Sequence, residues 1–290
     1  MNVQVSYEEK ETGTLYVVPT PIGNLEDMTF RAIKTLKEVD IIAAEDTRHT
    51  QKLLNHFEIK NRLLSYHEHS KRERMEQLIE RLKQGKNIAI VSDAGMPAIS
   101  DPGSELVQEV IKQEMQVVVL PGANAALCAL VGSGLSTDEF LFYGFLPRKK
   151  QEKEAELERL GSLKATLIFY ESPYRIKDTL QAIVKLLGNR QISISREITK
   201  IYEQIIRGYV KDVIRWAENN EIKGECCIVV EGNDAGEEKD SIWWQNLSIP
   251  DHVKHYEAST EMSHKAAMKQ VAVDRGISRR EVYQIIHVKK

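Results

Sequence analysis

Short apolar runs alternate with segments of helical periodicity from residue 14 to about residue 135. Runs that are apolar on both faces are typical of strands covered by helices on both sides, and their alternation with helices is typical of a parallel α/β sheet. The predicted strands are Thr14–Val18, Ile41–Ala44, Leu63–Tyr66, Asn87–Val91 and Val117–Leu120. The predicted helices are Thr29–Val39, Arg48–Phe57, Met75–Leu82 and Leu106–Ile111. The pattern therefore predicts a first domain, residues 12–134, around a five-stranded parallel sheet.

The pattern changes after Gly134, where strand-like runs come to outnumber helical segments. The predicted strands here are Phe140–Tyr143, Thr166–Tyr170, Gln191–Ser195, Tyr202–Tyr209 and Cys226–Glu231. The predicted helices are Gln151–Leu160, Arg175–Leu187 and Val210–Asn219. Because no helix separates the third strand from the fourth, we expect these two strands to pair antiparallel. We therefore predict a second α/β domain, residues 135–232, with a mixed sheet.

The last part of the chain has a different pattern. A polar stretch without periodicity follows residue 232, and we interpret residues 233–262 as a linker. Ser263 can cap one helix, and Ser278 with Glu281 forms a capping box that can open another. Residues 263–290 are thus predicted to form a helix-turn-helix-like tail. Two such helices are typical either of a small appendage packed on the body or of a nucleic-acid contact.

Composition limits the class of protein. The 290 residues are 42% apolar and 29% charged, which is typical of a globular chain of about two domains. The net charge of -3 excludes a polycation, so any affinity for nucleic acid must come from a local patch. One such patch is the tail, where basic residues outnumber acidic ones eight to four over residues 252–290.

The cysteines and the amino terminus bear on the compartment. The cysteines are Cys128, Cys226 and Cys227, and the adjacent pair is poorly suited to a disulfide framework or a metal site. The first residues lack the pattern of a signal peptide. The uncharged segment Val117–Leu135 contains Pro121 and Gly122, which favour a strand, a turn and a helix over a membrane span. We therefore expect a cytoplasmic protein with neither a metal site nor a membrane anchor.

Candidate chemistry lies in the loops after the first-domain strands, because ligands of parallel α/β sheets bind beyond the carboxyl ends of the strands. The loops cover residues 19–24, 45–50, 92–103 and 121–125. Glu45 and Asp93 each follow a buried strand, where a carboxylate needs a partner or a function. We interpret Asp101, which precedes Pro102, as a helix N-cap with proline at the first helical position.

Absent motifs exclude several classes of enzyme. The first strand is followed by no GxGxxG, and the chain contains no phosphate-binding P-loop, no HExxH and no GxSxG. The sequence therefore speaks against an ATPase, a zinc metalloprotease and an α/β-hydrolase.

Eight ordered segments together give the chain a family resemblance. They are VPTPIGN (18–24), AAEDTRHT (43–50), VSDAGMPAISDPG (91–103), PGANAA (121–126), GFLPRK (144–149), FYESPYR (169–175), SREITKIYE (195–203) and KGECCIVVEG (223–232). They resemble the RsmI family, the ribosomal RNA small-subunit cytidine-2'-O-methyltransferases of the tetrapyrrole methylase superfamily. Met96, where threonine is usual, and Asn124, where proline is common, depart from the family pattern.

The resemblance implies a fold, a cofactor and a substrate. The fold would be that of the tetrapyrrole methylases, with S-adenosylmethionine bound in the cleft between the two α/β domains. The acceptor would be a cytidine 2'-hydroxyl of 16S rRNA near the decoding site of the small ribosomal subunit, and the protein would be a homodimer. A sulfonium donor needs no metal, because its leaving group is already activated and the protein must mainly align the reacting atoms.

The resemblance also carries roles to individual residues. Donor binding is expected at Pro21, Asp93, Gly95, Pro97, Ile99, Ser100, Pro121, Gly122, Ala123 and Tyr170, and at the backbone next to Glu225. The ribose hydroxyl must lose a proton, and the catalytic candidates on the acceptor side are Asn24, Glu45, Arg48, His67 and Glu171. Contacts to RNA phosphates are expected from Arg148, Lys149, Lys150, Arg279 and Arg280.

Two other functions stay open at this stage. One is a small-molecule methyltransferase of the same fold, acting for example on a tetrapyrrole ring; the basic tail and the Arg148–Lys150 patch speak against it. The other is a nucleic-acid-binding regulator in which the tail reads DNA and the α/β body senses a ligand. Methyl transfer to ribose in small ribosomal subunits would distinguish the rRNA 2'-O-methyltransferase from both of these alternatives.

Overall fold

The protein is described here from a computed structural model that covers residues 3–6, 11–67, 71–233, 244, 247–259 and 262–287. The chain divides into two compact units, Met1–Asn233 and Asp234–Lys290, which we describe separately. The first unit contains two five-stranded sheets, and the second is helical. None of the helices in the described ranges is long and apolar enough to cross a bilayer.

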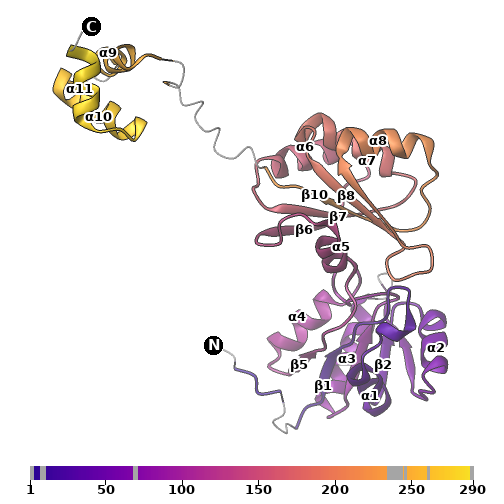
Figure 1. Ribbon diagram of the computed structural model, residues 1–290. Helices are drawn as coiled ribbons and strands as arrows, with labels where there is room; N and C mark the ends of the chain where they lie inside the picture. Colours follow the sequence, from indigo (N-terminus) through magenta and orange to yellow (C-terminus); the bar gives the residue numbers. More distant parts are fainter. Residues whose placement is uncertain are drawn as a thin grey trace. The chain divides into compact units, whose positions relative to one another are not determined.

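The first sheet is entirely parallel, with the strand order β3-β2-β4-β1-β5. Its strands β1, β2 and β5 are labelled in Figure 1. Its strands are β1 (Thr14–Val17), β2 (Ile41–Ala44), β3 (Leu63–Ser65), β4 (Ile88–Val91) and β5 (Gln116–Val119). One face carries α1 (Phe30–Glu38) and α2 (Thr47–His56), which follow the short 3-10 helix η1 (Leu25–Asp27). The other face carries α3 (Lys71–Lys83) and α4 (Ser104–Lys112). Both faces are buried, which explains why the strands are apolar throughout.

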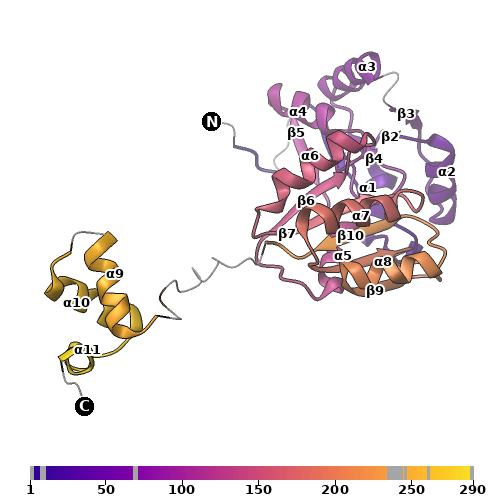
Figure 2. The same ribbon diagram turned by 90° about the horizontal axis from the view of Figure 1, so that it is seen from above.

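The second sheet is mixed, with the strand order β6-β7-β10-β8-β9. Its strands are β6 (Phe140–Phe145), β7 (Thr166–Glu171), β8 (Gln191–Arg196), β9 (Gln204–Tyr209) and β10 (Cys226–Val230). The outer layer consists of α6 (Lys150–Gly161), α7 (Ile176–Leu187) and α8 (Val210–Asn219), which Figure 2 shows from above. β8 and β9 pair antiparallel, as expected from the missing helix between them. The mixed sheet predicted from the sequence is therefore confirmed.

The helix α5 (Ala125–Ser133) follows the first sheet but packs on the second. Its small side chains Ala126 and Ala129 lie against Ile168 and Val229 of the second sheet. The helix ends at Gly134, whose positive φ of 77° is the left-handed conformation that glycine adopts without strain. The predicted first domain, residues 12–134, includes this helix, because the pattern of its residues does not indicate which sheet it covers.

The second unit contains three helices, α9 (Ile249–Ser259), α10 (His264–Arg275) and α11 (Arg279–His287), around a small apolar core. The predicted caps are present: Ser263 accepts the amide of Ala266, and Glu281 accepts the amide of Ser278. The sequence interpretation of residues 233–262 as a linker was wrong for α9. That helix has the sequence IPDHVKHYEAS, in which apolar residues are few, so its pattern did not stand out from a linker.

Candidate functional site

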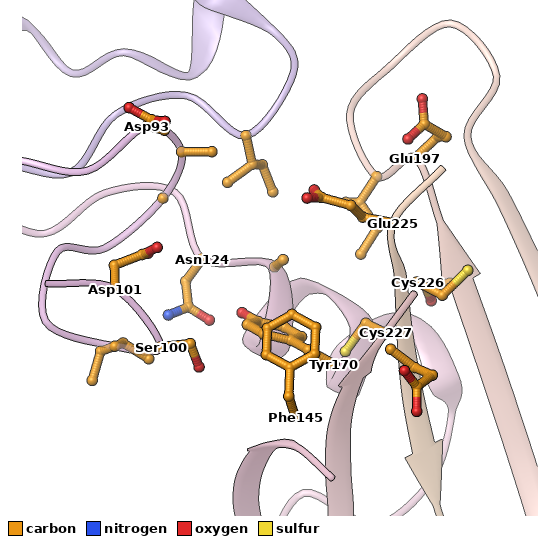
Figure 3. Close-up of a pocket in the computed structure, with 18 of the residues that line it drawn as sticks. Asp93, Ser100, Asp101, Asn124, Phe145, Tyr170, Glu197, Glu225, Cys226 and Cys227 are labelled. Carbon is orange, nitrogen blue, oxygen red and sulfur yellow. The ribbon is translucent and has the colours of Figure 1, made fainter. Parts of the chain in front are cut away.

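A cavity of about 420 Å³ lies where the carboxyl ends of the first sheet face the second sheet. This volume is in the range of small-molecule sites. The loops after β2 and β4 line one side, and the ends of β7 and β8 with the start of β10 line the other (Figure 3). Because all these segments belong to one compact unit, the cavity is a single site built from both sheets.

The loop after β4, residues 92–103, is held in a fixed shape. The amides of Thr20 and Gly95 each donate to the other residue's carbonyl, at 2.9 and 3.0 Å, so this loop pairs with the loop after β1. Ala98 and Ser100 have positive φ values of 69° and 61°, which cost energy for residues other than glycine. Strained backbone of this kind is concentrated at ligand sites, where the surrounding structure maintains it.

Carboxylates dominate the polar lining of the cavity. Asp93 and Asp101 lie on the first-domain side, and Glu197 and Glu225 lie opposite them (Figure 3). Asp93 Oδ1 accepts the amide of Asp46 at 3.1 Å, and Glu197 pairs with Lys200 at 2.9 Å. The site therefore favours cationic groups and hydroxyl donors, and it disfavours a bare anion.

Asp101 does not cap a helix, which corrects the interpretation drawn from its sequence. The helix α4 begins at Ser104, and its N-cap is Gly103, which provides no side-chain hydrogen bond. Asp101 lies earlier in the loop and lines the cavity. Burial and the nearby carboxylates of Glu45, Asp93 and Glu225 raise the pKa of Asp101 to about 7. Proline after an acidic residue did resemble a helix start, but the turn at Gly103 shifts that start by two residues.

The opposite wall of the cavity is aromatic and apolar. Tyr170 packs edge-on against Phe142 and Phe145, with ring centroids 4.9 and 5.6 Å apart. Burial raises the pKa of Tyr170 to about 12 and that of the Cys227 thiol to about 12, so both groups are neutral at physiological pH. This wall can accept the flat face of a nucleobase or another ring.

The buried hydroxyl of Ser195 also lines the cavity. This side chain is 1% exposed, and its Oγ has no hydrogen-bond partner within the described part of the chain. A buried hydroxyl without a partner costs free energy unless a ligand or water satisfies it. The acidic lining, the aromatic wall and this hydroxyl together fit a ligand that carries a positive charge, a ring and hydroxyl groups.

The structure brings part of the predicted donor-binding set to this cavity. The lining residues among that set are Asp93, Gly95, Ile99, Ser100 and Tyr170, and Glu225 lines it as well. Pro21, Pro97, Pro121, Gly122 and Ala123 are not among the lining residues, although their neighbours Ile22, Met96 and Asn124 are. Gly122 has a packing role, since a Cβ atom there would lie 2.7 Å from Pro19.

The predicted catalytic candidates separate in the structure. Glu45 and Glu171 line the cavity, whereas Asn24, Arg48 and His67 are not among its lining residues. Asn24 caps η1 by accepting the amide of Glu26, and Arg48 forms an exposed ion pair with Asp46 at 2.8 Å. These contacts give Asn24 and Arg48 local structural roles.

Glu171 is 1% exposed and has partners for both carboxylate oxygens. Its Oε1 accepts the amide of Ser172 at 2.8 Å and lies 3.4 Å from Arg175 Nε. Its Oε2 accepts the hydroxyl of Thr179 at 2.7 Å. This arrangement fixes the start of α7, so the geometry gives Glu171 a structural role at the edge of the cavity.

Sequence reasoning missed several lining residues. Glu197 and Lys200 come from the loop between β8 and β9, and Phe145 comes from the end of β6. The segments SREITKIYE and GFLPRK contain these residues and were part of the resemblance, yet they carried no donor-site assignment. Asn124 lines the cavity and also caps α5 by accepting the amide of Leu127, so its departure from the family pattern has a local structural role.

The basic residues predicted to contact RNA are all exposed. Arg148, Lys149 and Lys150 lie at the start of α6, and Lys149 pairs with Glu152 at 2.9 Å. Arg279 and Arg280 lie in the first turn of α11, in the second unit.

Comparison with known proteins defines the class to which this fold and cavity belong. A family model described as Tetrapyrrole (Corrin/Porphyrin) Methylases matches residues 14–214. Among solved structures, a cobalt precorrin-4 methyltransferase superimposes with a TM-score of 0.56 at 19% identity, over 75% of this chain and 94% of that one. A diphthine synthase superimposes with a TM-score of 0.59 at 13% identity, over 76% and 90% of the two chains. The fold is thus that of the tetrapyrrole methylases.

Curated relatives of the same length narrow the class. A Halalkalibacterium halodurans protein named ribosomal RNA small subunit methyltransferase I is 56% identical over 99% of both chains. Proteins of the same name from Bacillus subtilis and Streptococcus pyogenes are 53% and 46% identical, again over 99% of both chains. The chain therefore belongs to the ribosomal RNA small subunit methyltransferase I family, as the resemblance predicted. Methyltransferases of this family depend on S-adenosylmethionine, which confirms the predicted cofactor.

Proposed function

We propose that this protein transfers a methyl group from S-adenosylmethionine to the 2'-hydroxyl of a cytidine in 16S rRNA, near the decoding site of the small ribosomal subunit. The observation that carries the proposal is the acidic and aromatic cavity at the carboxyl edge of the parallel sheet, in a chain whose full-length relatives are named rRNA methyltransferases. The finer identity of the nucleotide comes from the family resemblance.

The lining residues fit the donor. Asp93 and its neighbours would hold the polar end of S-adenosylmethionine, and Tyr170 with Phe145 would face its ring system. The strained loop around Ala98 and Ser100 provides backbone groups in a fixed arrangement for the same purpose. The donor supplies an activated methyl group on a sulfonium, so the chain must align the acceptor oxygen and accept its proton.

Exposed basic residues would bind the RNA outside the cavity. Arg148, Lys149 and Lys150 follow β6, whose last residue, Phe145, lines the cavity. Arg175 donates to the carbonyls of Leu146 and Pro147 at 2.8 and 3.0 Å and so fixes this segment. Arg279 and Arg280 would add contacts from the helical unit. Because the patches are small and the net charge is -3, we expect recognition of the assembled small subunit in preference to naked rRNA.

The homodimer that the resemblance implies is part of the same proposal. Val131 of α5 is 74% exposed, and Leu127 of α5 and Val119 of β5 are also exposed apolar side chains. Apolar surface of this kind is typical of a subunit interface. Sedimentation analysis should find a dimer for the wild type, and a Val131→Asp variant should shift the protein toward a monomer; a monomeric wild type would contradict the proposal.

A methylation assay tests the proposed activity. Purified protein and labelled S-adenosylmethionine are incubated with small subunits from a strain that lacks this methyltransferase, and the modified nucleoside is identified by mass spectrometry. The expected product is one 2'-O-methylcytidine per subunit. Asp93→Ala should lower donor affinity in calorimetry by at least about tenfold, as expected for loss of a charged contact. Asp138→Asn, which changes an exposed carboxylate, is the matched control.

The outcome of the assay also separates the alternatives. Methylation of a base, of another nucleotide or of a small tetrapyrrole would contradict the proposed function. Equal methylation of naked rRNA fragments and of whole subunits would contradict the proposed recognition of the assembled particle.

A further inference from the structure

Asp101 differs from Asp93, Glu171 and Glu197 in its hydrogen bonds. Asp93 accepts a backbone amide, and Glu197 pairs with Lys200. The carboxylate of Asp101 receives no hydrogen bond from any described residue, although it is half-buried and points into the cavity (Figure 3). A half-buried carboxylate without donors is costly for the folded chain, which suggests a role in the reaction.

The surroundings of Asp101 make it a stronger base than an ordinary aspartate. Three carboxylates face it from different elements: Glu45 after β2, Asp93 after β4 and Glu225 before β10. Tyr170 on β7 is neutral, and Lys200, which lines the same cavity, is paired with Glu197. Burial, followed by repulsion from these carboxylates, raises the pKa of Asp101 to about 7. A base whose pKa is near the working pH combines a large ionised fraction with a strong affinity for a proton.

We propose that Asp101 is the proton acceptor for the hydroxyl that is methylated. In this step the acceptor oxygen forms a bond to the methyl carbon as the bond from that carbon to the sulfonium sulfur breaks. The electron pair of the broken bond stays on sulfur, which becomes a neutral thioether, and the hydroxyl proton moves to a carboxylate oxygen of Asp101. Water then takes the proton when the products leave. This assignment rests on the proposed methyl transfer to a ribose hydroxyl.

Other lining groups are less suited to the task. Glu171 has both oxygens occupied by partners, and the Asp93 carboxylate already accepts a hydrogen bond that holds two loops together. His67, the histidine among the catalytic candidates predicted from the sequence, is not among the residues that line the cavity. Asp101 thus combines access to the cavity and partial burial with the absence of a described donor, whereas Glu225, which also has no described donor, is exposed.

The test is a pH series of single-turnover methylation with small subunits at saturating S-adenosylmethionine. The wild-type rate is expected to rise about tenfold per pH unit in the acid range and to level off at or below pH 7, because only ionised Asp101 accepts a proton and a bound sulfonium favours the ionised carboxylate. Asp101→Asn should lose at least about 100-fold in rate and should keep its calorimetric affinity for S-adenosylmethionine within about threefold. Glu225→Gln, which removes one repelling charge, should move the inflection to lower pH. Asp138→Asn should leave the profile unchanged.

Each other outcome has a defined meaning. If Asp101→Asn keeps the wild-type rate and pH profile, the assignment is wrong while the proposed function stands. If its affinity for the donor falls in parallel with its rate, Asp101 is a binding residue and the assignment is again wrong. If the wild type transfers no methyl group to ribose, the proposed function fails and this assignment fails with it.

Discussion

Two acidic side chains on opposite sides of the cavity show how differently a carboxylate can be used. Glu171, at the end of β7, is almost fully buried and has an amide, a hydroxyl and a guanidinium as partners. Asp101, in the loop after β4, is half-buried, has no described hydrogen-bond donor and faces three other carboxylates. The charge of Glu171 is neutralised by its neighbours. The charge of Asp101 is left to be neutralised by a group that enters the cavity, such as a cation or a hydroxyl donor.

The comparison teaches that position beside a cavity does not define a catalytic group. Both residues line the same space, yet the partners of Glu171 connect it through Arg175 to the backbone at Leu146 and Pro147. Loss of Glu171 should therefore damage the fold, whereas loss of Asp101 should damage the reaction and relieve the fold. Four measurements test this contrast.

The largest effect on stability is expected for Glu171→Ala. Removing this buried carboxylate leaves the Thr179 hydroxyl and the Arg175 guanidinium without their partner, which should cost about 3 kcal/mol. Urea denaturation measures the change, and Asp178→Asn, at an exposed position of the same helix, is the control. A urea midpoint equal to that of the control would contradict a structural role for Glu171.

A smaller loss is expected for Thr179→Val, which keeps the shape of the side chain but deletes its hydroxyl. Glu171 Oε2 then loses the donor at 2.7 Å, and a buried acceptor without a donor costs about 1–2 kcal/mol. The same denaturation assay applies. The double variant Glu171→Ala/Thr179→Val should lose at most a few tenths of a kcal/mol relative to Glu171→Ala alone, since the two residues share one interaction. Fully additive losses would contradict that coupling.

Asp101→Asn should stabilise the fold, and the gain should depend on pH. The pKa of this carboxyl rises from about 4 in the unfolded chain to about 7 in the folded one, so the wild type loses stability as the pH rises between these values. Above pH 7 the variant avoids that loss, which we place at about 1 kcal/mol because the side chain is half exposed and solvent screens part of the repulsion. Thermal unfolding at pH 8 and pH 5 checks the sign: the gain should be clear at pH 8 and smaller at pH 5.

The smallest effect is expected for Arg48→Ala. The guanidinium pairs with Asp46, but the Arg48 side chain is 88% exposed, and ion pairs in water contribute little. The pair does hold the pKa of Asp46 well below its usual range, so the variant should raise that pKa toward its ordinary value. NMR titration measures this pKa, and the urea midpoint should not move; a clear loss of stability would show that the pair does more than its exposure suggests.

The sequence predicts the sheets of this fold well and the partners within the site less well. The strand Ile41–Ala44 and the antiparallel pair β8–β9 follow directly from apolar runs and from a missing helix, which are local features. The packing of α5 on the second sheet is not local, because an all-apolar helix fits either sheet. The helix α9 was missed for the opposite reason, since its apolar stripe is weak.

For the site, the sequence identifies which loops meet but not what each side chain contacts. Loops after parallel strands share one edge by geometry, and so Glu45 and Asp93 could be placed near one ligand, whereas the assignment of Tyr170, on β7 of the second sheet, came from the family resemblance. Whether a carboxylate has a donor depends on the backbone turn that follows it. The turn between β7 and α7 brings Arg175 and Thr179 to Glu171, and the turn at Gly103 leaves Asp101 without a helix to cap.

The negative charge of the cavity has a consequence for the shape in which a substrate can be accepted. Each phosphate that flanks a nucleotide would be repelled by the carboxylates near Asp101, so the proposed methylation of a ribose requires the sugar to reach inward while its phosphodiesters stay at the rim. An RNA whose tertiary structure already splays out one nucleotide meets this requirement without further distortion. A free mononucleotide, with its phosphate directly attached to the entering sugar, should therefore be a poor methyl acceptor.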